Sequence, residues 1–294
     1  MDKKPAGSTR ASNSEEEEDP IEALTGNLSN FLPPSGAAVH NRTARGRFRV
    51  TKAERLFADS KKSGTEDGLQ FDTANFAEDE LDEMLEKFFE TSAPSKVKRS
   101  EGIGWIRVVS ASYKEEGLGN LEDLEADWKK LQRSRQNIDF NAIKQLAIPH
   151  KCLGGIWLLF LDTGEEIDNA WEKIARATVR DKLGTHAKVT PREDTKEGKA
   201  LYATASQEQH VVSVYTKDFT DKEDVMKVEA KLRKLGFRGR IVFKPRVYSS
   251  LGIYSENQWG LRPGIYTSNW DPRKLAGNIR DCTKSRVTYM INDQ

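Results

Sequence analysis

The sequence predicts an α+β domain over residues 100–294, preceded by a long arm. All six Trp and all seven Tyr residues lie beyond residue 100, and a folded core needs such apolar area to offset the entropy of ordering the chain. In the same region strand-like and helix-like patterns alternate, and some connections are as short as those of hairpins. This combination favours α+β over a doubly wound parallel sheet.

The arm, residues 1–70, is expected to be disordered. It contains an acidic run at residues 14–19, the breaker cluster Pro33-Pro34-Ser35-Gly36 and a basic stretch at residues 40–55. Such compositions lack the apolar area that a core requires. The basic stretch could neutralise phosphates without folding, or could be a solvated arm with no partner.

Residues 71–99 are expected to be an acidic amphipathic helix followed by a linker. Leu81, Met84, Leu85 and Phe88 have the i, i+3, i+4, i+7 spacing of one helix face, which predicts a helix from about Phe76 to Phe89. Its polar face is almost wholly acidic. The helix could pack on the domain, which is the simpler role, or shield a basic groove.

Five strands and four helices are expected in the domain. The strands are 105–109, 156–161, 186–189, 210–215 and 240–244. The helices carry apolar residues at helical spacing over 121–131, 140–147, 167–175 and 225–232. Gly184 is expected to end the third helix, whereas a capping box at residues 220–223 begins the fourth and Gly236 ends it. Residues 245–294 are predicted to be rich in turns.

Several classes of protein are excluded by what the chain lacks. No apolar leader or run of membrane-spanning length is present, and the two cysteines are too few for a disulfide scaffold or a four-cysteine zinc site. The common nucleotide-hydrolase, zinc-protease and esterase motifs are missing, and His150 beside Cys152 is not expected to act as a base–nucleophile pair. We expect a monomer of the cytoplasm or nucleus that is not an enzyme and has no metal, cofactor or membrane partner.

The segment Gly154-Gly155-Ile156-Trp157-Leu158 resembles the cap-binding translation initiation factor of the 4E type. In that factor a GG-x-W-L strand is followed by a helix carrying a Trp, a strand pair around a basic loop, and a helix that ends in Gly. The chain has these features in the same order over about residues 103–245. The resemblance implies a curved, mainly antiparallel sheet backed by three helices.

A closer resemblance, over about residues 103–268, is to the basophilic-leukaemia-expressed protein family, which looks like a divergent branch of the same fold. The segments that carry it are 104–106, 145–148, 157–158, 170–171, 174–177, 188–189, 215–216, 218–221, 244–245, 247–248, 251–254 and 259. It extends into a C-terminal segment that the initiation factor does not share.

The resemblance to the initiation factor implies a changed ligand site. The factor holds methylguanine between two Trp rings and binds it with a Glu, but residues 141–153 contain neither Trp nor Glu. Tyr113 stands near the first stacking position, and Lys188, Arg192, Lys196 and Lys199 occupy the phosphate-binding loop region. Phosphate contacts without the Trp sandwich imply binding of nucleic acid or nucleotide without methyl-cap selectivity.

The function expected from the sequence is therefore non-catalytic binding of RNA or a nucleotide in the concave face of the sheet. The candidate binding residues are Tyr113, Lys188, Arg192, Lys196, Lys199, Tyr254 and Trp259, of which Tyr113 and Trp259 would supply stacking. The alternative is a protein-interaction module with a degenerate ligand site, in which a helical face with Trp128 and Leu131 receives a protein partner. A third, weaker alternative is an enzyme that acts on a nucleotide.

Overall fold

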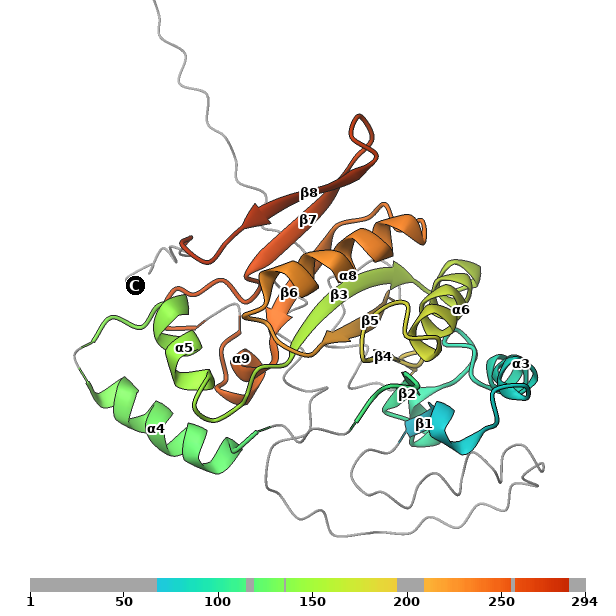
Figure 1. Ribbon diagram of the computed structural model, residues 1–294, viewed down its shortest axis with the longest axis horizontal. Helices are drawn as coiled ribbons and strands as arrows, with labels where there is room; N and C mark the ends of the chain where they lie inside the picture. Colours follow the sequence, from blue (N-terminus) through green and yellow to red (C-terminus); the bar gives the residue numbers. More distant parts are fainter. Residues whose placement is uncertain (1–67, 115–118, 135, 195–208, 255–256, 286–294) are drawn as a thin grey trace, which may run out of the picture.

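The computed structural model describes residues 68–114, 119–134, 136–194, 209–254 and 257–285. These residues form one eight-stranded sheet with the order β1-β2-β4-β5-β3-β6-β7-β8 (Figure 1). The strands are β1 (Gly68–Asp72), β2 (Trp105–Val109), β3 (Gly155–Asp162), β4 (His186–Val189), β5 (Gln209–Thr216), β6 (Ile241–Pro245), β7 (Tyr266–Asp271) and β8 (Ala276–Asp281). Only the β1–β2 pair is parallel, so the α+β class and the mainly antiparallel, curved sheet are confirmed.

Six α-helices lie in the described residues, and the sequence predicted all of them except the last; the resemblance implied three helices behind the sheet. They are α3 (Leu81–Thr91), α4 (Leu121–Arg133), α5 (Phe140–Ala147), α6 (Glu165–Val179), α8 (Lys222–Lys234) and α9 (Arg246–Ser250). Figure 1 shows α6 and α8 across one face of the sheet, with α3 beside α6 and with α4, α5 and α9 grouped at one end.

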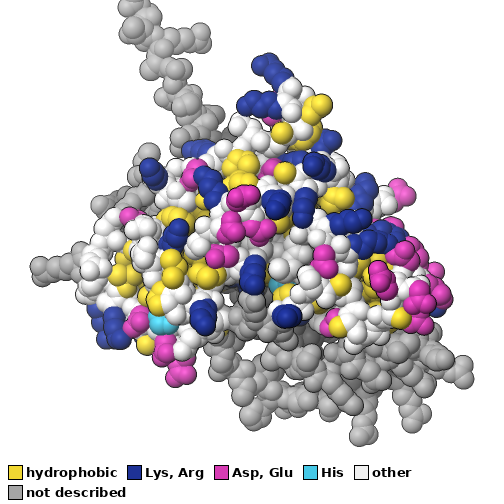
Figure 2. All heavy atoms as spheres, viewed as in Figure 1, with side chains coloured by type: hydrophobic (Ala, Val, Ile, Leu, Met, Phe, Trp, Pro, Cys, Tyr) yellow, Lys and Arg dark blue, Asp and Glu magenta, His cyan; other side chains and the backbone are white. Residues whose placement is uncertain are grey.

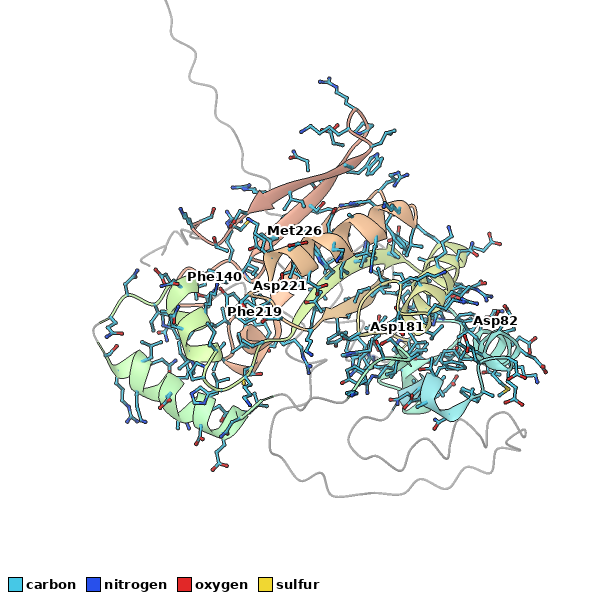
Figure 3. The ribbon with its side chains drawn as sticks, in the orientation of Figure 1. Asp82, Phe140, Asp181, Phe219, Asp221 and Met226 are labelled. Carbon is cyan, nitrogen blue, oxygen red and sulfur yellow. The ribbon has the colours of Figure 1, made fainter. Side chains whose placement is uncertain are left out.

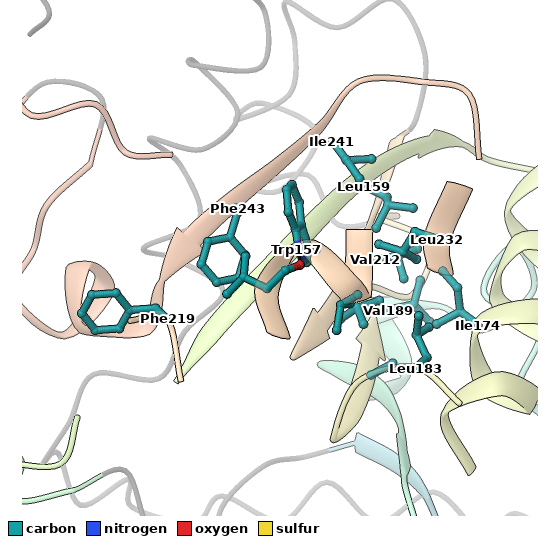
Figure 4. Close-up of a cluster of buried hydrophobic side chains, with 14 of the residues drawn as sticks. Trp157, Leu159, Ile174, Leu183, Val189, Val212, Phe219, Leu232, Ile241 and Phe243 are labelled. Atoms are coloured by element: carbon teal, nitrogen blue, oxygen red, sulfur yellow. Dashed lines mark hydrogen bonds between the residues drawn. The ribbon is translucent and has the colours of Figure 1, made fainter. Parts of the chain in front are cut away.

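The main core lies between the sheet and these helices. Figure 4 shows Trp157 and Leu159 of β3 directed toward the same side as Ile174 of α6 and Leu232 of α8. The Trp157 indole is fully buried, and its Nε1 donates to the Val225 carbonyl of α8 at 2.9 Å. Because a buried indole needs a hydrogen-bond acceptor as well as apolar contact, this bond fixes α8 over the central strand.

The acidic helix α3 packs on this helical layer. Its Phe88 ring lies 5.4 Å from the Phe71 ring of β1. Arg176 of α6 donates to Glu86 at 2.5 Å, and Arg180 donates to Asp82. In the structure this helix therefore packs on the domain, which is the simpler of its two expected roles.

The N-terminal boundary of the folded part differs from the sequence prediction. Residues 68–70, which the sequence placed in the arm, belong to β1, and the rest of the arm lies outside the described residues. The helix begins at Leu81 and not at Phe76, because Phe76 has extended backbone after a short 3-10 turn at residues 73–75. The strand and the helix both contribute to the main core.

Two predicted helix ends are wrong, and one is confirmed. Helix α6 ends at Val179, before the position predicted from Gly184. The residue with a positive φ after the helix is Asp181, at 56°, and not a glycine. Gly184 is required for another reason, since a Cβ there would lie 2.2 Å from the Tyr215 carbonyl oxygen. Helix α8 is capped by the Asp221 carboxylate, which accepts from the Asp224 amide at 3.1 Å, and not by a box starting at Thr220. Its predicted end at Gly236 is confirmed by a φ of 102°.

The C-terminal part is more regular than its sequence suggests. The segment predicted to be rich in turns contains α9 and the hairpin β7–β8, which extends the sheet by two strands. Strand β8 has almost no buried side chain. The period-two apolar pattern by which a strand is recognised is therefore missing from its sequence.

A buried ion pair ties α8 to this hairpin. The Arg233 guanidinium donates to Glu229 Oε1 at 2.8 Å, to the Ser268 carbonyl at 2.8 Å and to the carbonyls of Phe237 and Gly239 at 3.0 and 2.7 Å. The Ser268 hydroxyl donates to the same carboxylate at 2.6 Å. Nearly every polar atom of the pair is thus satisfied, which is the condition for a buried pair to be tolerated.

We expect Arg233→Met to lower the free energy of unfolding by about 3–5 kcal/mol, because Glu229 would keep a buried charge without its partner. Urea denaturation measures the change. Lys234→Met, at the exposed neighbouring position, is the control and should stay within about 0.5 kcal/mol of the parent. Equal stabilities of the two variants would contradict a structural role for the pair.

Candidate functional site

The second face of the sheet, opposite α6 and α8, gathers basic side chains. Side chains alternate between the faces of a strand, so the residues between the core positions meet in cross-strand rows on this side. One row contains Arg107, Lys188, Ser213, Leu158 and Val242. In the neighbouring row Tyr215 and Lys244 flank Ile156, and His186 lies beside Tyr215. We call Arg107, Lys188 and Lys244 the basic face.

Rings and guanidinium groups form a continuous series at one end of this face. The Arg107 guanidinium lies 5.7 Å from the Tyr113 ring, which lies 5.1 Å from the His186 ring. His186 stacks on Tyr215 at 3.9 Å with an interplanar angle of 18°, and the Arg246 guanidinium lies 5.3 Å from Tyr215. We call these five residues the ring ladder. Each of its two ends is a cation.

The pKa of His186 is set first by burial and then by the cations around it. Burial lowers the pKa of this imidazole well below its ordinary value of 6.5, and the charges of Arg107, Arg246 and Lys188 lower it further. The ring is therefore neutral near pH 7, because burial disfavours its charged form and the three neighbouring cations would repel it. An anion placed in the same region would be attracted for the same reason.

Four members of the ring ladder line a cleft of about 1170 Å³ at the end of the sheet, namely Tyr113, His186, Tyr215 and Arg246. Figure 2 shows Lys, Arg, Asp and Glu side chains together around the hollow in the middle of the view. Figure 3 labels two acidic residues of the cleft, Asp181 after the end of α6 and Asp221 at the start of α8. The cleft is large enough for a small ligand such as a nucleotide.

Three acids of the cleft are engaged in local structure. Asp181 accepts from the Ser112 hydroxyl at 2.6 Å, Asp218 accepts from the Thr220 amide at 2.7 Å, and Asp221 caps α8. By contrast, within the described parts of the chain no ion pair is formed by the cleft cations Lys114, Lys151, Lys227 and Arg246. Hydrogen bonds to neutral groups leave these carboxylates charged, and Glu223 and Asp224 also line the cleft, so the cleft presents charges of both signs.

The predicted phosphate-binding residues occupy different environments. Lys188 is 8 % exposed, and its Nζ lies 5.9 Å from the Trp105 ring on the basic face. Arg192 is exposed, and its backbone pairs with Val97 and Arg99. Lys196 and Lys199 lie outside the described residues. Of the four, Lys188 is the one that the structure places beside the ring ladder.

The predicted aromatic residues do not form one site. Tyr113 belongs to the ring ladder, whereas the Tyr254 ring lies 4.3 Å from Lys244 Nζ, and its hydroxyl donates to the Ser249 carbonyl at 3.3 Å. Lys244 is 2 % exposed, and burial lowers its pKa to about 7. Trp259 packs edge-on against Trp128 at 4.8 Å and does not line the cleft with Tyr113.

The residues of the alternative docking face are largely covered. Trp128 is 6 % exposed beneath Trp259, and Leu131 is half-buried against the main core. Cys152 and His150 also have separate partners, since the Cys152 thiol donates to the His150 carbonyl at 3.5 Å while the His150 ring contacts Asp127 at 3.1 Å. This geometry does not align the His150 ring with the thiol.

Sequence reasoning missed four members of the ring ladder: Arg107, His186, Tyr215 and Arg246. Arg107, His186 and Tyr215 were recognised only as parts of strands. Their meeting depends on strand pairing between residues about thirty to eighty positions apart along the chain, which no local pattern specifies. The sequence pattern that could have identified them is a polar or aromatic residue at a non-core position of each of the apolar strands β2, β4 and β5.

Among the described residues, no group of three or more His, Cys, Asp and Glu side chains could hold a metal ion. In the same part of the chain, none of the helices combines the length and the apolar character needed to cross a membrane.

The fold and the cleft define the class of the protein. It is an α+β protein with helices on one face of its sheet, and rings and cations gather at one end of the opposite face. Residues 120–252 match the family model described as basophilic leukemia-expressed protein Bles03. The matched segment runs from the start of α4 through α9 and includes His186, Tyr215 and Arg246. Over this segment the chain is similar to that family, which is the resemblance predicted from the sequence.

We expect His186 to make stability depend on pH. The native pKa of His186 lies below the ordinary 6.5. As the pH falls through 6.5, His186 therefore binds a proton in the unfolded chain but not in the native state. The free energy of unfolding should then fall by up to about 1.4 kcal/mol per pH unit between about pH 6.5 and the native pKa. His186→Phe keeps a ring on Tyr215 and should flatten this part of the profile. Identical profiles from urea denaturation would contradict the assignment.

Proposed function

We propose that the protein binds RNA or a nucleotide, without catalysis, at the ring ladder and the adjoining basic face. The observation that carries the proposal is the clustering of Arg107, Lys188 and Arg246 around a neutral, stacked His186 at a cleft. Positive charge beside aromatic rings is the combination that proteins use to bind single-stranded nucleic acid.

The proposed contacts divide between phosphate and base. Arg246 and Arg107 have planar guanidinium groups that can donate two hydrogen bonds to a phosphate, and Lys188 adds a point charge. Tyr113, whose ring is tilted against His186 at 5.1 Å, offers its ring to a base. Contacts of this kind position a nucleotide without reading its sequence.

The fold is proposed to be related to that of the cap-binding initiation factor. The one-sided helical layer and the basic second face support this relationship. The described residues of the cleft lining include no Trp, and a single Tyr stack lacks the two π-faces that select a cationic base. The proposal therefore includes equal affinity for methylated and unmethylated guanine nucleotides.

The protein-docking alternative has less support. A partner that docked on Trp128 would first have to displace Trp259, whose ring covers it at 4.8 Å. Binding would then lose the contact energy of that aromatic pair before gaining any of its own. No observation on the described residues favours the nucleotide-enzyme alternative.

We expect Arg246→Gln and Tyr113→Ala each to weaken binding of a fluorescently labelled tetrauridylate by about tenfold, because a charged phosphate contact or a base stack is lost. Arg133→Gln on α4 is the control and should bind within about twofold of the parent. Fluorescence anisotropy measures the affinities, and thermal melting verifies that the variants are folded. Unchanged affinity in both site variants would overturn the proposal.

A further inference from the structure

A stripe of positive charge leads away from the cleft along α8. Lys227, Lys231, Lys234 and Arg238 follow one another at intervals of four, three and four residues, which places them on one side of the helix and its following turn. Glu229 is the only acid between Asp224 and Arg238 and is buried with Arg233. Every exposed charge over this stretch is therefore positive.

The hairpin β7–β8 continues this stripe. The Arg238 guanidinium lies 3.7 Å from the Trp270 ring of β7, and the hairpin rises above α8 and projects from the body of the molecule (Figure 1). At its tip the Asp271 carboxylate accepts from the Arg273 amide at 2.9 Å, which fixes the turn that presents Arg273 and Lys274. Figure 2 shows Lys and Arg side chains up to this tip.

We define the basic track as the four stripe residues with the two at the tip, which are Lys227, Lys231, Lys234, Arg238, Arg273 and Lys274. Interaction with the helix dipole accounts for cations in the last turn of α8 only. It does not account for Lys227, which lies in the middle of the helix, or for Arg273 on another element. Lys227 also lines the cleft, so the track and the cleft are continuous.

We infer that the ligand is a single-stranded RNA several nucleotides long, which runs from the cleft along the basic track to the tip of the hairpin. The inference rests on the proposed function and extends it from a nucleotide to a strand. The stretch of α8 from Lys227 to Lys234 is about 10 Å long, which matches about three nucleotides of a stacked strand. Positive charges that follow a single line can contact the phosphates of a single nucleic-acid strand.

The partner is a nucleic acid because rings accompany the charges at both ends of the path. Tyr113 and Tyr215 lie at the cleft, and Trp270 lies beneath Arg238 at the other end. A cationic groove with interspersed aromatic rings binds single strands through phosphate contacts and stacking together. An acidic peptide would use the charges but would have no use for the rings.

The test uses the full chain, labelled uridylates of one, four and twelve nucleotides, and two variants that each lose three positive charges. The track variant is Lys231→Gln, Lys234→Gln and Arg273→Gln. The control variant is Lys129→Gln, Arg133→Gln and Lys144→Gln, on α4 and α5. Affinities are measured by anisotropy at several salt concentrations, with a polyglutamate peptide of matched charge as a competitor.

We expect the parent to bind the twelve-nucleotide strand most tightly and the track variant to lose about tenfold or more on this strand alone. Its slope of log affinity against log salt should be shallower by about two, since each lost contact removes about 0.7. The control variant should keep both the affinity and the slope of the parent.

Other results would overturn the inference in distinguishable ways. Equal losses of affinity in both variants would show a general effect of net charge. Unchanged affinity in the track variant would show that RNA binds at the cleft and not along the track. Polyglutamate that competes as well as RNA would identify the track as a surface for acidic proteins. If the parent binds none of the uridylates, the proposed function and the inference are both wrong.

Discussion

The pairing register of the central strands determines every other feature of the site. Trp157, Val214 and Ala187 face α6 and α8 in one row, so their neighbours Ile156, Tyr215 and His186 must face the other way. A slip of one residue would carry the Trp157 indole out of the core and the charged residues into it. The burial that stabilises the helical side therefore also assembles the basic face.

Local patterns predicted most of the fold because apolar periodicity survives in single segments. The strand at Trp105 and the helix around Trp128 fall where their sequences place them. Strand β8 was missed because its side chains are exposed on both faces. The end of α6 was misplaced because Asp181, and not a glycine, adopts the left-handed backbone. Both failures occur where tertiary contacts override local preference.

The candidate site was less predictable than the fold. Tyr113 and Lys188 were identified from the sequence and lie beside the ring ladder. Trp259, expected to stack with Tyr113, instead covers Trp128, because a loop indole near an apolar helix gains more from burial than from exposure. The charge of the region becomes visible only when residues of β2, β4 and α9 are brought around one imidazole.

The most direct test of nucleotide binding at the ring ladder is a chemical-shift titration of the isotope-labelled protein with uridine monophosphate. If the ladder is the binding site, the largest changes will fall on the backbone amides at and beside Tyr113, His186, Tyr215 and Arg246. Side-chain rings shift nearby resonances strongly, so even weak binding is detectable. Changes centred on α4 around Trp128, or no changes at saturating nucleotide, would contradict the assignment of this site.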